Sequence, residues 1–69
     1  MINLELLEEF IKRSGMSYTN IAKELNITYV ALIGKRRGER PFTLTEALAL
    51  KKILNLTQSE WNAVFDEVE

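Results

Sequence analysis

Four cationic side chains cluster near the middle of the chain. Lys35, Arg36, Arg37 and Arg40 fall within six residues. Clustered basic side chains can contact phosphate groups, although without a supporting motif such a cluster is more often a solvated loop. The acidic residues gather mainly toward the two ends of the sequence. Although the net charge is −1, the positive and negative side chains are separated along the sequence. The basic part could therefore bind an anionic partner.

The side chains on which most enzymes and metal sites depend are missing. The sequence contains no cysteine and no histidine, which removes disulfides, thiolate nucleophiles, zinc fingers and the commonest general base. Glu8 and Glu9 are adjacent, as are Asp66 and Glu67, and neighbouring residues of a helix point apart. Neither a Walker-type phosphate loop nor a dinucleotide fingerprint occurs. We therefore expect no enzyme activity, metal, cofactor or small-molecule substrate.

Size and composition predict a single globular domain over residues 1–69. Apolar residues make up 46% of the chain and charged residues 28%, as in folded domains near the lower size limit for one core. No apolar run approaches the roughly 20 residues of a membrane span. The first residues carry acids rather than the basic region of a signal peptide. We expect a soluble, cytoplasmic protein with no membrane partner.

Apolar residues recur with helical spacing and never convincingly with the period of a strand, so the sequence predicts an all-α fold. The expected helices cover residues 3–14, 17–25, 29–37, 44–55 and 57 onward. Their expected N-caps are Asn3, Ser17, Thr28, Thr43 and Thr57. The inward, apolar face of the fourth helix should consist of Leu44, Ala47, Leu48, Leu50, Ile53 and Leu54. The apolar face of the fifth helix, which could serve the core or a dimer contact, should consist of Trp61, Val64, Phe65 and Val68.

The second and third predicted helices should be joined by a very tight turn. Asn26 is the best candidate for the positive φ angle that such a turn needs, because asparagine tolerates it better than other residues with a side chain. Ala22 would allow the two helices to approach closely. Leu32 is the expected inward anchor of the third helix, and Gly38 its left-handed stop.

The spacing of Ile21, Ala22, Leu25, Asn26, Ile27, Leu32 and Gly38 resembles the helix-turn-helix of the Cro and phage-repressor family. The string PFTLTEALALKKILNLT also resembles small Cro-like regulators of Gram-positive phages and integrated elements. This resemblance covers nearly the whole chain. It implies a compact five-helix lambda-repressor-like DNA-binding domain in which helices 2 and 3 form the helix-turn-helix. It also implies a transcriptional regulator of the repressor type. The family usually has an apolar residue where Lys35 or Arg36 stands here.

The resemblance places residues 28–37 in the major groove of double-stranded DNA and assigns contacts within and around that helix. The expected base contacts are Thr28, Tyr29, Val30, Ile33, Gly34 and Arg40. The expected phosphate contacts are Ser17, Tyr18, Asn20, Lys35, Arg36 and Arg37, with Lys52 a weaker candidate. Val30 and Ile33 suit the methyl groups of thymine. Gly34 would let the helix approach the bases, at a cost of about 1 kcal/mol in helix stability relative to alanine.

Members of this family often bind a two-fold operator as a dimer. We expect a homodimer to form through the fifth helix, by way of Trp61, Val64, Phe65 and Val68. The alternative is a protein-interaction module or antirepressor that keeps the fold without binding DNA. Salt separates the two hypotheses, because only phosphate binding weakens steeply as salt rises.

Overall fold

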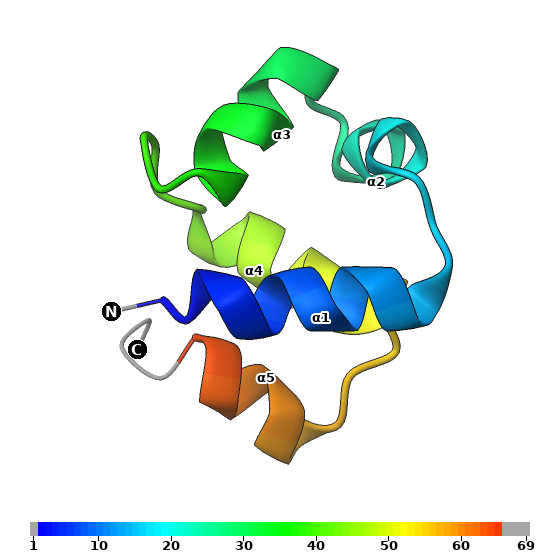
Figure 1. Ribbon diagram of the computed structural model, residues 1–69, viewed down its shortest axis with the longest axis vertical. Coiled ribbons are helices and arrows are strands. Elements are labelled where there is room, and N and C mark those ends of the chain that lie inside the picture. Colours follow the sequence, from blue (N-terminus) through cyan, green and yellow to red (C-terminus); the bar gives the residue numbers. More distant parts are fainter. Residues whose placement is uncertain (1, 66–69) are drawn as a thin grey trace.

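The computed structural model describes residues 2–65, which contain five helices joined by loops and no strand (Figure 1). The helices are α1 (Leu4–Ser14), α2 (Tyr18–Leu25), α3 (Tyr29–Arg36), α4 (Leu44–Ile53) and α5 (Gln58–Val64). In Figure 1, α2 and α3 lie at one end, α1 crosses the middle and α5 lies at the opposite end. The predicted all-α fold is confirmed. None of the described helices is both long and apolar enough to cross a bilayer.

Each helix begins at a polar side chain that accepts a hydrogen bond from the first turn. Asn3, Ser17 and Thr28 cap α1, α2 and α3 in this way. Thr43 and Thr57 form complete capping boxes, each with the glutamate three residues later. Such caps satisfy backbone N–H groups that have no partner inside the helix, typically stabilising it by about 1 kcal/mol. All five predicted N-caps are confirmed.

Residues with positive φ angles follow the first four helices. Asn26 has a φ of 60°, and its neighbour Ile27 donates a backbone hydrogen bond of 3.0 Å to the carbonyl of Ala22. Gly38 has a φ of 82° and plays the same part after α3. Both were predicted. Asn55, with a φ of 54°, ends α4 in the same way, so α4 stops at Ile53 and not at the predicted residue 55. Likewise α3 ends at Arg36, one residue early.

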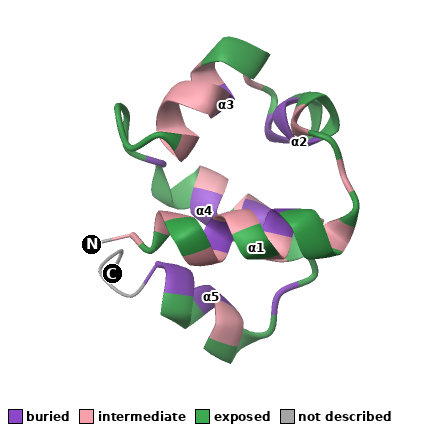
Figure 2. Ribbon diagram, in the orientation of Figure 1, coloured by how far each residue is buried: buried purple, intermediate pink, exposed green. Residues whose placement is uncertain are grey.

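The core is assembled from every helix. Its fully buried large side chains are Phe65, Leu7, Ile21, Leu32, Leu50 and Val64. Trp61 joins them: its indole N–H donates a 2.8 Å hydrogen bond to the carbonyl of Ala47, and its ring lies 5.5 Å from that of Phe65. Phe42, from the loop before α4, meets Phe65 edge to face. Figure 2 marks the buried positions, which occur in all five helices.

The predicted dimer surface on α5 is wrong for its described residues. Trp61, Val64 and Phe65 are 8%, 0% and 1% exposed, because a chain of this size needs them for its own core. They cannot also cover a second copy. Val68 lies outside the described residues. The prediction for α4 was also partly wrong: Leu44 and Leu48 are 50% and 51% exposed instead of facing inward.

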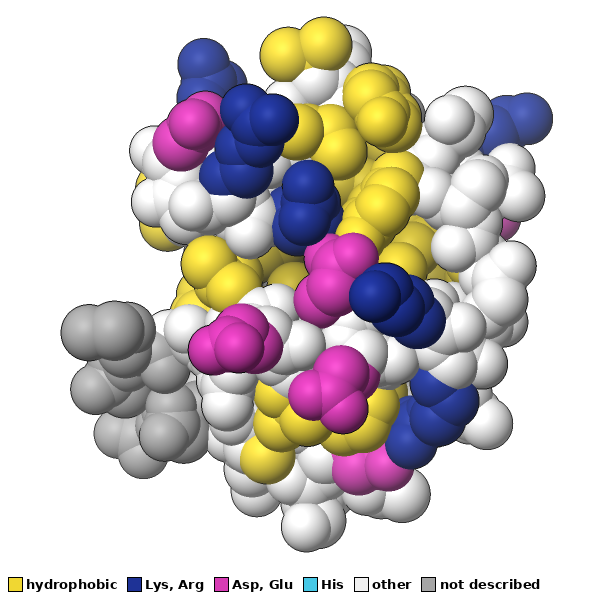
Figure 3. Space-filling model, viewed as in Figure 1, with side chains coloured by type: hydrophobic (Ala, Val, Ile, Leu, Met, Phe, Trp, Pro, Cys, Tyr) yellow, Lys and Arg dark blue, Asp and Glu magenta, His cyan; other side chains and the backbone are white. Residues whose placement is uncertain are grey.

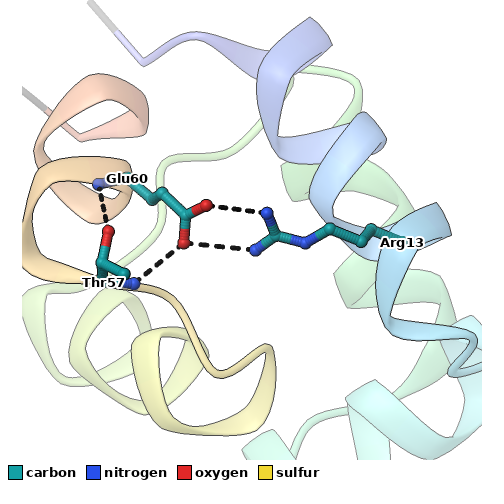
Figure 4. Close-up of polar contacts among 3 residues, drawn as sticks. All are labelled: Arg13, Thr57 and Glu60. Atoms are coloured by element: carbon teal, nitrogen blue, oxygen red, sulfur yellow. Dashed lines mark hydrogen bonds and ion pairs between the residues drawn. The ribbon is translucent and has the colours of Figure 1, made fainter.

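A polar clasp joins the first and last helices (Figure 4). The guanidinium of Arg13 donates two hydrogen bonds to Glu60, of 2.7 and 3.2 Å. Glu60 also accepts from the backbone N–H of Thr57, so one carboxylate serves both the clasp and the capping box. The hydrogen bonds from Arg13, and then that from Thr57, lower the pKa of Glu60 to about 2. Nearby, the N–H of Asn3 donates to the carbonyl of Val64.

Candidate nucleic-acid interface

The arrangement of α2 and α3 leaves one side of α3 open to solvent. Ile21, Ala22 and Leu25 of α2 are buried, and Leu32 of α3, 1% exposed, faces them. The other side of α3 begins with Thr28, Tyr29 and Val30, all exposed. Figure 2 shows this first turn projecting from the end of the molecule. The start of α3 is therefore uncovered and well placed to contact a partner, whereas the rest of the helix is half-buried or buried.

Apolar side chains dominate the open side of α3. Tyr29 is 51% exposed and Val30 79%, and they are two of the four large hydrophobic residues that the described chain leaves exposed. Ile33, one turn after Tyr29, is half-buried. Thr28 is exposed, but its hydroxyl accepts the N–H of Ala31 as the helix cap. Three predicted base contacts, Thr28, Tyr29 and Val30, therefore lie at the start of α3, and two of them present apolar surface to water.

Gly34 lies one turn beyond Val30 and is half-buried. A Cβ atom built at this position would have Oε1 of Glu39 at 3.8 Å and Cδ of Arg40 at 4.0 Å as its nearest neighbours. These are ordinary van der Waals distances, so packing inside the chain does not require glycine here. Gly38 differs, because its φ of 82° and a Cβ contact of 3.2 Å to Leu4 both favour glycine. The glycine at position 34 is thus unexplained by the fold itself.

Lys35 is not available for phosphate, contrary to the prediction. Its ammonium group lies 3.0 Å from Oε1 of Glu46 and donates to the carbonyl of Pro41, also at 3.0 Å. The side chain is only 12% exposed. Partial burial raises the pKa of Glu46, but the Thr43 backbone N–H and Lys35 together lower it below its usual value. Lys35 ties the end of α3 to the start of α4.

Arg36 is also committed inside the chain. Its Nη1 donates to Oε1 of Glu8 at 3.2 Å, and its guanidinium carbon lies 5.2 Å from the centre of the Tyr18 ring. Its Nε is buried without a hydrogen-bond partner among residues 2–65. Glu8 also accepts from the Tyr18 hydroxyl. This cluster of Glu8, Tyr18 and Arg36 joins α1, α2 and α3, and Glu8 accepts both the Tyr18 hydroxyl and Nη1 of Arg36.

The charges in this cluster stabilise one another. The hydrogen bond from Tyr18 lowers the pKa of Glu8, and the positive charge of Arg36 lowers it further against the opposing effect of desolvation. Desolvation and the bond to Glu8 raise the pKa of Tyr18 to about 12. Tyr18 therefore stays a neutral donor and Glu8 a charged acceptor at neutral pH. The cluster fixes the end of α3 against α1, and within it the negative charge of Glu8 balances the positive charge of Arg36.

Arg37 and Arg40 keep their side chains exposed and form no ion pair within residues 2–65. Figure 3 shows cationic side chains gathered beside α3 and the loop after it, next to hydrophobic side chains. Among residues 2–65, two of the four clustered cations thus have no ion pair, and two are internal ties. Lys52, the weaker candidate, is exposed on α4.

The opposite flank of α3 carries a cation that the sequence reasoning missed. Lys23 is exposed near the end of α2 and lines a shallow hollow with Tyr29, between the two helices. The sequence could have indicated this residue, because Lys23 lies one turn before Asn26 and therefore close to the turn that leads into α3. Ser17 and Asn20 are exposed at the start of α2, where the Ser17 hydroxyl accepts the N–H of Asn20. Exposed cations therefore lie on both sides of the apolar turn of α3.

This geometry can hold an anionic, partly apolar surface: apolar side chains at the centre and cations at the margins. The described residues bring together Thr28, Tyr29 and Val30 with Arg37, Arg40 and Lys23 as the accessible groups around α3. Comparisons with protein-family models, with curated proteins and with solved structures found no match to this chain. Its family resemblance rests on its own residue pattern.

Proposed function

We propose that this chain binds double-stranded DNA in a sequence-specific manner, as a small Cro-like transcriptional repressor of a phage or mobile element. In this proposal α2 and α3 form a helix-turn-helix, and α3 enters the major groove. The observation that carries it is the exposed start of α3, with Tyr29 51% and Val30 79% exposed, flanked by the exposed cations Arg37 and Arg40. Base contacts need an uncovered helix, and phosphate contacts need free cations beside it.

The dimensions of α3 are compatible with this role. Its eight residues span about 12 Å, close to the width of the major groove. Arg37 and Arg40 at its end, and Lys23 near its start, would meet the backbones that border the groove. The free N–H groups at the start of α2, beside Ser17 and Asn20, add a further phosphate contact. The phosphate set is therefore smaller than the sequence predicted, and we expect moderate affinity.

A binding experiment with a charge-matched control tests the proposal. Duplexes are selected from a random pool, and the dissociation constant of the best one is measured at several salt concentrations. Arg37→Glu should weaken binding by at least about ten-fold, because it replaces an attraction to phosphate with a repulsion. Lys12→Glu changes the net charge equally on the exposed side of α1 and should have little effect. Equal losses in the two variants, or no selected sequence, would count against the proposal.

Binding of two copies to a two-fold operator stays part of the proposal, with half-sites about 34–36 Å apart. The surface joining the copies has to lie elsewhere than on the buried side of α5. Sedimentation of the protein with a duplex carrying one or two half-sites would give the number of copies bound. A single copy on the duplex with two half-sites would contradict this part of the proposal.

A protein-interaction role is the second candidate, and one observation favours it. Leu44 and Leu48 are one turn apart on α4 and half exposed, so they present an apolar surface that the chain does not cover. Docking of a partner helix there would depend little on salt, unlike DNA binding. Leu48→Glu should abolish partner binding and leave DNA binding unchanged. The two functions are thereby separable in one pair of assays.

A further inference from the structure

We propose that α3 recognises thymine through its C5-methyl group, so that the preferred duplex carries thymine where Val30 touches the groove. The inference rests on the proposed DNA binding and deepens it by naming the chemical group that is read. Two observations support the inference: the side chains that the start of α3 exposes, and the side-chain types that are missing from it.

Residues 28–34 contain no side chain that reads guanine or adenine by paired hydrogen bonds. The segment is TYVALIG, without arginine, lysine, asparagine or glutamine. Paired hydrogen bonds to guanine come from arginine or lysine, and those to adenine from asparagine or glutamine. Only the hydroxyls of Thr28 and Tyr29 remain, and that of Thr28 already accepts the N–H of Ala31 at 3.0 Å.

The next cations along α3 cannot fill this gap. Lys35 is held by Glu46 and Pro41, and Arg36 by Glu8. Releasing either would break an ion pair that fixes α3 against a neighbouring helix. Arg37 and Arg40 follow the last residue of α3, and we assign them to the phosphates that border the groove. Most of the exposed surface at the start of α3 is therefore hydrocarbon.

Val30 is the most exposed large hydrophobic residue of the described chain, at 79%. The thymine methyl is the apolar group that base pairs present in the major groove. Contact between the two removes both from water, whereas the other bases present no methyl group to the valine. Gly34, one turn later, has no side chain of its own to hold the helix away from that methyl.

Charge decides between this partner and an apolar protein surface. Arg37 and Arg40 on one flank and Lys23 on the other are exposed, so the apolar turn is bordered by positive charge. An apolar protein groove would leave these cations without partners, whereas a DNA groove is bordered by phosphates on both sides. The apolar centre and the cationic margin therefore match the same ligand.

Deoxyuridine provides the test, because it differs from thymidine only by the missing methyl group. Each thymine of the selected duplex is replaced in turn, and the dissociation constant is measured for the wild type and for Val30→Ala. At one or two positions, loss of the methyl should weaken wild-type binding by about four-fold, the value of one buried CH₂-sized group. In Val30→Ala the same replacement should change binding by less than about half as much in free energy.

The Val30→Ala variant shows whether Val30 is the side chain that reads the methyl group. Val30 is exposed, so its truncation leaves the core intact, which a thermal melt verifies. Binding of DNA with no loss at any deoxyuridine would overturn the inference and leave the proposed function standing. So would a full loss that persists in Val30→Ala, since another side chain would then read the methyl. Failure to bind any selected duplex would overturn both.

Discussion

Nη1 of Arg36 lies 3.2 Å from Oε1 of Glu8, and the same carboxylate accepts the hydroxyl of Tyr18. These three residues come from α3, α1 and α2, so a cation at the end of α3 holds three helices together. The cationic cluster therefore divides into two pairs with different tasks. Lys35 and Arg36 position α3, while Arg37 and Arg40 are exposed and have no ion pair in the described part of the chain.

Replacing Arg36 with methionine should lower stability without removing a phosphate contact. The pair with Glu8 is about 30% exposed, so solvent screening limits its loss to about 1 kcal/mol. Methionine keeps an unbranched stem over the Tyr18 ring. Urea unfolding should show this loss, while the slope of log affinity against log salt stays unchanged. A slope that falls by about 0.9 would mean that Arg36 does contact a phosphate.

Gly34→Ala should stabilise the chain and weaken its binding to DNA. Alanine gains about 1 kcal/mol over glycine inside a helix, and the nearest atoms, at 3.8 and 4.0 Å, leave room for the methyl. The same methyl would hold α3 away from the bases. Thermal unfolding and a titration of the selected duplex measure the two effects.

Gly38→Ala is the matched control for that variant. Its φ of 82° and the 3.2 Å contact with Leu4 should make alanine destabilising, by about 1 kcal/mol or more. A Gly34→Ala protein that is more stable and binds DNA as tightly as the wild type would show that Gly34 does not approach the bases.

The clasp between Arg13 and Glu60 predicts how stability depends on acid. In the folded chain the pKa of Glu60 is about 2, against 4.5 for an ordinary glutamate, because Arg13 and Thr57 donate to its charged form. A lowered folded-state pKa means that its stabilisation is complete above about pH 4.5 and is lost as the pH falls toward 2. Glu60→Gln should flatten the fall in unfolding free energy over that range.

A second variant isolates the Arg13 contribution to this effect. Arg13→Met should flatten the same pH range, because Arg13 is the largest cause of the lowered pKa of Glu60. The double variant should add little to either single change. Urea midpoints at a series of pH values between about 2 and 5 provide the measurement. Curves parallel to that of the wild type would contradict the role of the clasp.

Local rules were enough to predict where the helices begin and turn. Ser17, Thr28 and Thr43 cap helices because a short polar side chain reaches the N–H groups of its own first turn. Asn26 and Gly38 take positive φ angles for an equally local reason, since few other residues tolerate them. All these features depend on neighbours within about four residues, which the sequence displays directly.

The errors concern partners distant in sequence. Arg36 is paired with Glu8, which is 28 residues away, and a run of cations gives no sign of such an ion pair. Helical spacing identifies an apolar face on α5 but does not tell whether the face covers the chain's own core or a second copy. In α4, apolar residues occur around the whole helix, so the pattern could not show that Leu44 and Leu48 face outward.

Amide chemical shifts recorded while the selected duplex is added to the labelled protein test the central claim most directly. The largest changes should map to residues 28–34, with further changes at Arg37, Arg40 and the start of α2. Leu44 and Leu48, on α4, should shift little. Changes concentrated on α4, or spread evenly over the molecule, would contradict the placement of α3 in the major groove.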